Sequence, residues 1–304
     1  MEGYEMLRDI PQFSSWSRIE TVSNGWSDDR KYRILNNQGE HLLLRTADIS
    51  RYDRKREEFQ WLQKAAATGA PMPKAIDCGV CNGSRDVYLL LSWLEGAELK
   101  GCLGGLSPED CHRLGVEAGG ILRKIHQTTA PLGLGDYKSQ MQEIFHQKMQ
   151  AYHHCGLKVE NGDVLLSFMD RSFQLLHGVP QCFLHGDFHP GNLVLGTDGK
   201  LSVIDFDRFE IGDSVRDFTR LAVFSRLDSV DFARGQIDGY FEDKVPDYFF
   251  PRLAFYAAFD SFFSLVWASC RGEGEVKQAR MRIGTVYDDF AGFTRCIPGW
   301  YSNG

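Results

Sequence analysis

Apolar residues come in short runs through the first third of the chain, and polar turns separate these runs. The runs are Trp16–Val22, 31–35, 41–46 and 87–93. Between them, the turns at 23–29 and 36–39 each contain a glycine. This order is typical of antiparallel strands joined by tight turns. The sequence therefore predicts a small sheet close to the N-terminus.

The apolar spacing changes to a helical repeat after residue 52. Phe59, Leu62 and Ala66 share one face if residues 52–68 form a helix. Gly69 follows directly, and the prolines after it cannot continue a helix. We therefore expect one helix between the strands of the small sheet.

Helical patterns dominate from residue 107 onward. Ser107 suits an N-cap and Pro108 suits the first helical position, so a helix is expected over 108–126. Further helices are predicted over 137–152, over 164–176 and through most of the chain after 214, and short strands over 193–195 and 201–204. This order predicts an α+β fold with a small β-rich lobe, residues 1–95, and a larger helical lobe, residues 96–304. Clefts between lobes are usual ligand sites.

Composition and charge narrow the class of protein. The chain of 304 residues has no run of about 18 apolar residues, and its first residues lack an apolar signal core. We therefore expect a cytoplasmic protein without a membrane partner. The net charge of −7 argues against nucleic-acid binding, which needs a basic surface. We expect a monomer or weak dimer.

The cysteines do not indicate disulfides or a metal site. The eight cysteines are scattered along the chain, and reduced thiols are the default for a cytoplasmic protein. Cys78 and Cys81 form a single CxxC pair, whereas a structural zinc site needs four ligands. We expect these two thiols to be reduced and close to a turn.

The segment from His185 to Asp207 carries the residues suited to chemistry. Asp187 lies in a loop rich in glycine and proline, Asn192 follows just before a strand, and Asp205 follows the next strand. Phosphoryl transfer needs a carboxylate to accept the proton of an attacking hydroxyl group. It also needs oxygen ligands for Mg²⁺. Asp187 fits the base, and Asn192 and Asp205 fit the metal ligands.

The roles of one aspartate and two histidines in this segment stay open. Asp207 is either a second carboxylate near the metal or a solvated turn residue. His185 and His189 have a spacing that could bind zinc on a helix, but the glycines and proline between and after them make a helix improbable there.

The run HGDFHPGN, followed by VIDFD, resembles the aminoglycoside phosphotransferase and choline kinase-like family. The resemblance implies a protein-kinase-like fold, Asp187 as the catalytic base, Asn192 as a metal ligand, and Asp205 as the metal-binding Asp after the next strand. It also implies that His185 braces the catalytic loop. The later segment GDSVRDF resembles the family's GDP-x-x-D-L segment, so Asp217 is expected to brace the same loop.

The resemblance also implies a nucleotide site in the small lobe. Ser27, in the turn after the first strand, is placed to donate to a phosphate group. The backbone groups of Ser92, Trp93 and Leu94 are placed to hydrogen-bond the purine base.

Arg45 stands where most relatives have a lysine that grips the α- and β-phosphates. Arginine keeps the charge but reaches differently. A carboxylate on the following helix should pair with it, and we expect Glu58, with Glu57 as the alternative.

An acceptor would bind against helices of the C-terminal half, where aminoglycoside sites of the family are acidic. Asp260, Asp228 and Asp231 are the candidate residues. Asp260 lies in an aromatic segment, where a carboxylate needs a partner. The alternative is a structural Asp paired with a backbone group or an arginine.

These features predict a small-molecule kinase that transfers the γ-phosphate of ATP or GTP, with Mg²⁺ as cofactor, to a hydroxyl group. An aminoglycoside-type antibiotic is the first expectation for the acceptor, and its positive charge would suit an acidic protein. The alternative is a metabolic kinase of a sugar, an amino alcohol or a nucleoside. A nucleotide-binding regulator with weak catalysis is a third interpretation, which rests only on Arg45.

Overall fold

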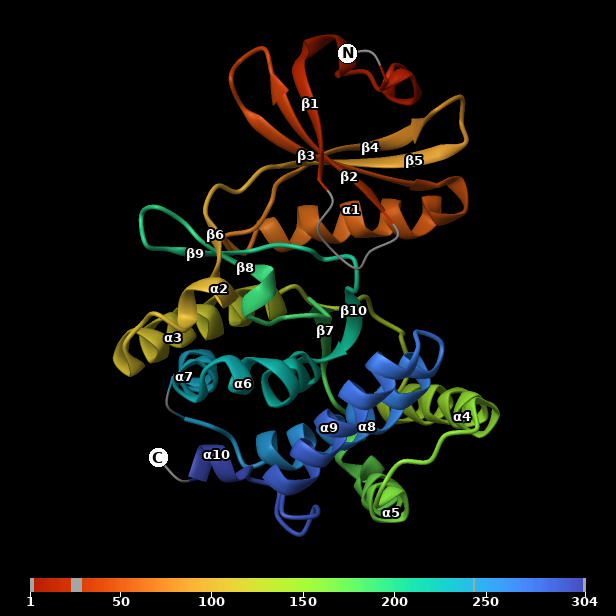
Figure 1. Ribbon diagram of the computed structural model, residues 1–304, viewed down its shortest axis with the longest axis vertical. Helices are drawn as coiled ribbons and strands as arrows, with labels where there is room; N and C mark the ends of the chain where they lie inside the picture. The colour runs from red at the N-terminus through yellow and green to blue at the C-terminus, as the bar shows by residue number, and fades with distance from the viewer. Residues whose placement is uncertain (1–2, 23–28, 243, 303–304) are drawn as a thin grey trace.

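The computed structural model describes residues 3–22, 29–242 and 244–302, and these form a small sheet lobe above a larger helical lobe (Figure 1). The predicted α+β class is confirmed. The small lobe is an antiparallel sheet with strand order β1-β2-β3-β5-β4. Its strands are β1 (Trp16–Val22), β2 (Arg30–Asn36), β3 (His41–Asp48), β4 (Ala75–Cys81) and β5 (Asp86–Ser92).

Strand β4 is the one strand of this sheet that the sequence did not indicate. Its apolar residues Ile76 and Val80 point outward and are exposed, so its pattern lacks a buried face. Both cysteines lie within this strand, and Cys81 directly precedes the turn at 82–85, so the pair lies close to a turn as expected. Both thiols are free, and burial raises the pKa of Cys78 to about 11.

Helix α1 (Tyr52–Ala66) covers one face of the small sheet. The predicted helix is confirmed, but its buried face includes Glu58, Trp61 and Leu62, whereas Ala66 of the expected face is exposed. The opposite face of the sheet packs against the N-terminal segment through Leu7 and Ile10. Side chains that point from β2 and β3 toward α1 therefore face the large lobe.

The large lobe consists mainly of helices. They are α2 (Leu99–Leu103), α3 (Pro108–His126), α4 (Tyr137–Cys155), α5 (Gly162–Ser172), α6 (Arg226–Asp228), α7 (Val230–Phe241), α8 (Phe249–Ser269), α9 (Glu273–Asp289) and α10 (Gly299–Ser302). The short strands are β6 (Ala97–Glu98), β7 (Gln181–Leu184), β8 (Leu193–Leu195), β9 (Leu201–Val203) and β10 (Glu210–Asp213). The predicted cap of α3 is confirmed, because the Ser107 hydroxyl accepts a hydrogen bond from the Asp110 amide at 3.1 Å.

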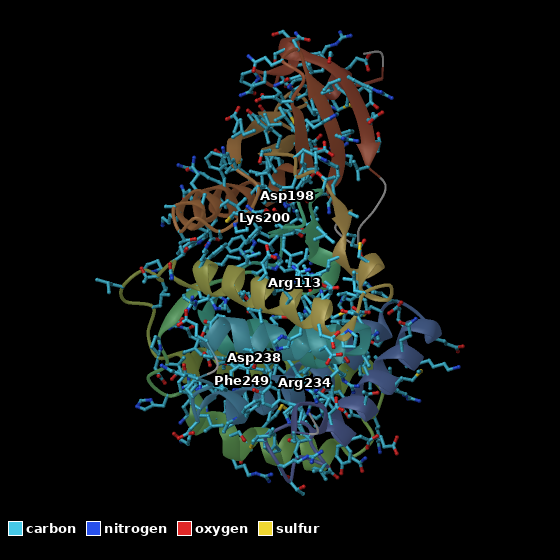
Figure 2. All side chains as sticks on the ribbon, turned by 90° about the vertical axis from the view of Figure 1, so that its left-hand side faces the viewer. Arg113, Asp198, Lys200, Arg234, Asp238 and Phe249 are labelled. Atoms are coloured by element: carbon cyan, nitrogen blue, oxygen red, sulfur yellow. The ribbon has the colours of Figure 1, made fainter. Side chains whose placement is uncertain are left out.

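Helices α3 and α7 pack unusually closely through glycines. Figure 2 shows α3, which carries Arg113, directly above α7, which carries Arg234 and Asp238. A Cβ atom on Gly119 of α3 would overlap the backbone of α7, and one on Gly239 of α7 would overlap the backbone of α3. The two helix backbones are therefore in direct contact.

Helix α1 is fastened to the large lobe. The ring of Trp61 stacks on Phe183 of β7, with centroids 5.3 Å apart, and such pairs add about 0.5–1.5 kcal/mol beyond simple burial. Arg54 donates to the carbonyl oxygen of Phe209 at 2.6 Å. One hydrophobic core runs across both lobes, so the division at Glu95–Gly96 stays a prediction. No helix in the described ranges is long and apolar enough to span a bilayer.

Candidate active site

A single buried carboxylate holds the catalytic loop. Asp217 accepts hydrogen bonds from the backbone amides of His185 and Gly186, both at 2.7 Å. Its Oδ2 atom also lies 3.0 Å from Nε2 of His126. Burial opposes ionisation, but the hydrogen bond from His126 and those from the loop hold the pKa of Asp217 below its ordinary value. Asp217 thus lies where the sequence predicted a bracing residue.

His185 connects the same loop to the strand beside it. Its Nδ1 atom accepts from the Asp187 amide at 3.1 Å, so Nε2 carries the proton and donates to the carbonyl of Ile204 at 2.9 Å. Gly186 has φ of +79°, and a Cβ atom there would overlap the carbonyl oxygen of Arg208. Only glycine allows the loop to approach the 205–209 segment so closely.

Asp187 points into a cationic environment. Its Oδ1 atom lies 2.8 Å from Nε of Arg220, and its Oδ2 atom lies 3.8 Å from Nε of Arg208. His189 is 3.8 Å away, and burial lowers the pKa of His189 to about 4 despite the attraction of Asp187. Sequence reasoning did not find Arg220. Its only signal is its position three residues after Asp217, just before the π-helical turn Leu221–Ser225.

Asn192 and Asp205 are brought together by the backbone. The side-chain amide of Asn192 donates to the Asp187 carbonyl at 2.9 Å, and the Asn192 carbonyl accepts from the Ile204 amide at 2.9 Å. Asp205 follows Ile204 and has a left-handed φ of 64°. Asn192 thus has its side-chain amide oxygen left for another partner, and its backbone is bonded to the residue before Asp205.

This pair fits a magnesium ion that is bound together with phosphates. The described part of the chain has no group of three or more His, Cys, Asp or Glu residues spaced to hold a metal ion by themselves. Mg²⁺ is usually held by one or two protein oxygens together with waters and substrate phosphates. Asn192 and Asp205 supply such a donor set.

Asp207 belongs to a buried cluster of charges. Its Oδ1 atom lies 2.7 Å from Nη2 of Arg45 and 2.9 Å from Nζ of Lys55. Burial alone would raise the pKa of Asp207, but these two cations outweigh it and hold that pKa far below its ordinary value. The alternative that Asp207 is a solvated turn residue was wrong, because its carboxylate is tied to two cations of the small lobe. Its role as a metal ligand stays a prediction.

Arg45 lies at the centre of that cluster. Its Nη1 atom donates to Glu58 at 2.6 Å, which confirms the expected pairing with Glu58 rather than Glu57. Its Nε atom donates to Asp29 at 2.8 Å. Burial lowers the pKa of Arg45, but the surrounding carboxylates raise it further, so the guanidinium stays charged. Sequence reasoning missed Asp29 and Lys55, because nothing in their local pattern marks buried charges.

Lys31 forms a separate ion pair on the same face of the sheet. Its Nζ atom lies 3.1 Å from Oδ2 of Asp205. Burial raises the pKa of Asp205, and Arg45 and Lys31 together lower it below its ordinary value. A cation of the small lobe therefore contacts the proposed metal ligand directly.

Comparison with known proteins shows the family of this chain. Residues 18–254 match the model of the phosphotransferase enzyme family. The chain belongs to that family. The expected family and the expected phosphotransferase activity are thereby confirmed. None of the curated proteins matches this phosphotransferase by sequence.

Solved structures share the fold at low sequence identity. A thermostable mutant of aminoglycoside phosphotransferase APH(4)-Ia is 19% identical, with TM-score 0.65, and the match covers 92% of this phosphotransferase and 97% of that chain. A choline/ethanolamine kinase family protein from Mesorhizobium loti is 14% identical, with TM-score 0.66 and 95% coverage of both chains. A putative fructosamine-3-kinase from Haemophilus somnus 129PT is 16% identical, with TM-score 0.63, covering 89% and 91%.

The backbone groups expected to bind a purine base, those of Ser92, Trp93 and Leu94, are only partly free of other hydrogen bonds. The amide of Ser92 donates to the Lys74 carbonyl at 3.0 Å, and the amide of Trp93 donates to the His41 carbonyl at 3.2 Å. Leu94 makes no hydrogen bond to any described residue. Ser27 lies outside the described residues.

None of the three acidic candidates forms an ion pair with the residues that contact the carboxylate of Asp187, which are Arg220, Arg208 and His189. Asp260 lies 3.9 Å from Nη2 of Arg216, so the alternative of a structural Asp with an arginine partner is the one observed. Burial raises the pKa of Asp228, while Lys100 opposes that shift. Asp231 is half-buried in the first turn of α7. Among the described residues, cations rather than acids contact Asp187.

Proposed function

We propose that this phosphotransferase transfers the γ-phosphate of ATP or GTP to a hydroxyl group of a small molecule. The observation that carries the proposal is the rigid unit of Asp187, Asn192 and Asp205. Asp187 is bonded through its own backbone to His185 and to Asn192, and Asn192 is bonded to the residue before Asp205. A base and two oxygen ligands held in this way suit phosphoryl transfer, which is mostly a matter of position and charge.

Each residue of the unit has one task in this proposal. Asn192 and Asp205 hold Mg²⁺, which when bound neutralises charge on the phosphates. Arg220 holds Oδ1 of Asp187 at 2.8 Å, so Oδ2 is the oxygen left to accept the proton of the acceptor hydroxyl. Arg208 lies near that oxygen, at 3.8 Å, and is placed to meet the transferred phosphate. Leu94 and the Trp93 carbonyl receive the purine.

Two acceptor classes remain, and different observations favour them. The names of similar structures favour an aminoglycoside, since one of them is a ternary complex with ADP and hygromycin B. The charges beside Asp187 favour the metabolic alternative, because Arg220 and Arg208 would repel a polycation. Asp260 is already paired with Arg216 and offers no free acid in compensation.

A nucleotide-consumption assay tests the proposal. ATP and GTP are each offered with Mg²⁺ and a panel of aminoglycosides, sugars, amino alcohols and nucleosides. Consumption stimulated by one class, with the phosphorylated acceptor seen by mass spectrometry, supports the proposal and names the class. Nucleotide binding without consumption by any acceptor would favour the regulator interpretation instead.

The assay needs a matched control for the base. Asp187→Asn should remove most of the nucleotide consumption, whereas Asp198→Asn should leave it unchanged. Asp198 lies at the turn between β8 and β9 (Figure 2), where its carboxylate caps the amide of Lys200 at 3.1 Å. The proposal includes a cytoplasmic location, where both nucleotides are present, and a monomer or weak dimer. Size-exclusion chromatography tests the latter.

A further inference from the structure

Two cations of the small lobe lie side by side above the catalytic loop. Lys31 of β2 and Arg45 of β3 are direct partners in the antiparallel register. Opposed residues of neighbouring strands project from the same face of a sheet. That face is the one covered by α1, because Arg45 contacts Glu58 of that helix. Either cation could therefore serve a nucleotide bound between the lobes.

Arg45 has no capacity left for a phosphate. It is 2% exposed, and its guanidinium contacts the carboxylates of Asp29, Glu58 and Asp207 at 2.6 to 2.8 Å. Glu58 and Asp29 are themselves buried, so movement of Arg45 toward a ligand would leave buried carboxylates short of a partner. The planar fork of arginine suits this task, since it serves several carboxylates at once.

Lys55 is engaged in the same way. Its ammonium group lies 2.6 Å from Asp29, 3.1 Å from Glu58 and 2.9 Å from Asp207. The cluster contains these two buried cations and three carboxylates, and the exposed Arg51 lies at its edge, 4.0 Å from Asp207, so its formal charge is zero. The cluster therefore offers a triphosphate no net attraction, and another cation has to face the phosphates.

Lys31 is such a cation. In the described ranges it makes one ion pair, with Asp205, and an ammonium group has three donors. Its side chain is 13% exposed and that of Asp205 is 29% exposed, so the pair borders open space. Asp205 is also the proposed metal ligand. A metal ion on Asp205 would displace the ammonium group toward the nearest anion, which is the nucleotide's own phosphate.

We propose that Lys31, and not Arg45, is the small-lobe cation that binds the nucleotide's phosphates, and that Arg45 is a positioning residue that holds α1 and Asp207 in place. This inference rests on the proposed function, because it assumes a nucleoside triphosphate between the lobes. It gives the phosphate-binding charge to a different strand from the one that the family resemblance implied.

Nucleotide binding tests the inference without any acceptor. Isothermal titration calorimetry with Mg²⁺ compares adenosine, ADP and ATP, and the matching guanine series, for each variant. Lys31→Met should weaken ADP and ATP binding by about 10- to 100-fold, which is the range of one hydrogen bond to a charged group. Adenosine affinity should stay unchanged. Lys31→Arg should restore part of the loss.

Two further variants make the result specific. Arg18→Met removes an exposed positive charge from β1 and should leave every affinity unchanged. Arg45→Lys should lower the melting temperature, since a lysine would lose the fork in which three separate guanidinium nitrogens bond Asp29, Glu58 and Asp207. The variant should bind ADP within a few-fold of wild type. Wild-type ADP affinity in a folded Lys31→Met variant would overturn the inference alone. A wild-type protein that binds no nucleotide would overturn both the inference and the proposed function.

Discussion

Replacement of Asp217 by asparagine tests how the catalytic loop is held. The two carboxylate oxygens accept the amides of His185 and Gly186 separately, each at 2.7 Å. Asparagine offers one acceptor oxygen, so one of these amides would face an NH₂ group instead. His126 can change tautomer and keep its bond. The loss is thus one hydrogen bond to a charged group, which corresponds to about 1.5–3 kcal/mol.

Thermal unfolding followed by circular dichroism measures that loss. At roughly 2–4 °C per kcal/mol for a chain of a few hundred residues, the melting temperature of Asp217→Asn should fall by roughly 3–12 °C. Asp198→Asn is the control, because its carboxylate lies at the turn between β8 and β9. A melting temperature for Asp217→Asn within about 1 °C of wild type would show that the carboxylate does not hold the loop.

The stabilisation that the Asp217 carboxylate provides should also depend on pH. Because the pKa of Asp217 is lowered in the folded protein, its carboxylate stabilises the fold above the unfolded value of about 4. That contribution disappears as the pH falls through the folded pKa. The difference in unfolding free energy between wild type and Asp217→Asn should therefore narrow from pH 7 to pH 3.5. A difference that stays constant would mean that the stabilisation does not depend on the charge.

Three more substitutions test other parts of the structure. Asp187→Asn should lower turnover by about 10²–10⁴-fold and change nucleotide affinity only a few-fold, and turnover near wild type would exclude Asp187 as the base. Gly119→Ala should destabilise the fold by about 1–3 kcal/mol in denaturant unfolding, whereas Gly120→Ala in the same helix, where a Cβ atom meets nothing within 4 Å, should stabilise it slightly. Trp61→Ala should lower the free energy of unfolding by about 3–5 kcal/mol. Trp267→Ala should lower it by less than about 1 kcal/mol, because that side chain is 38% exposed. Equal losses for the two variants would contradict the stacked contact between the lobes.

The fold could be predicted where burial leaves a periodic trace in the sequence. Strands β1 to β3 and helix α3 follow their apolar pattern and capping residues, because one face of each is buried. Strand β4 left no such trace, since Ile76 and Val80 point to solvent. Local pattern predicts an element only when the element buries a continuous face.

Only those site residues that belong to one continuous sequence motif could be predicted. Asp187, Asn192 and Asp205 stand in one segment of about twenty residues, and the structure brings them together as the motif implied. Lys55 and Asp29 could not be predicted, because their partners come from separate segments that meet only in the folded chain. The contact of Arg220 with Asp187 could not be predicted for the same reason.

The attachment of α1 to the large lobe has a consequence for control of the enzyme. In protein kinases the corresponding helix is positioned by regulatory signals, and its movement switches activity. Here Trp61 is stacked on Phe183, and Arg54 is bonded to the backbone after β9. A signal that moved this helix would have to break both contacts.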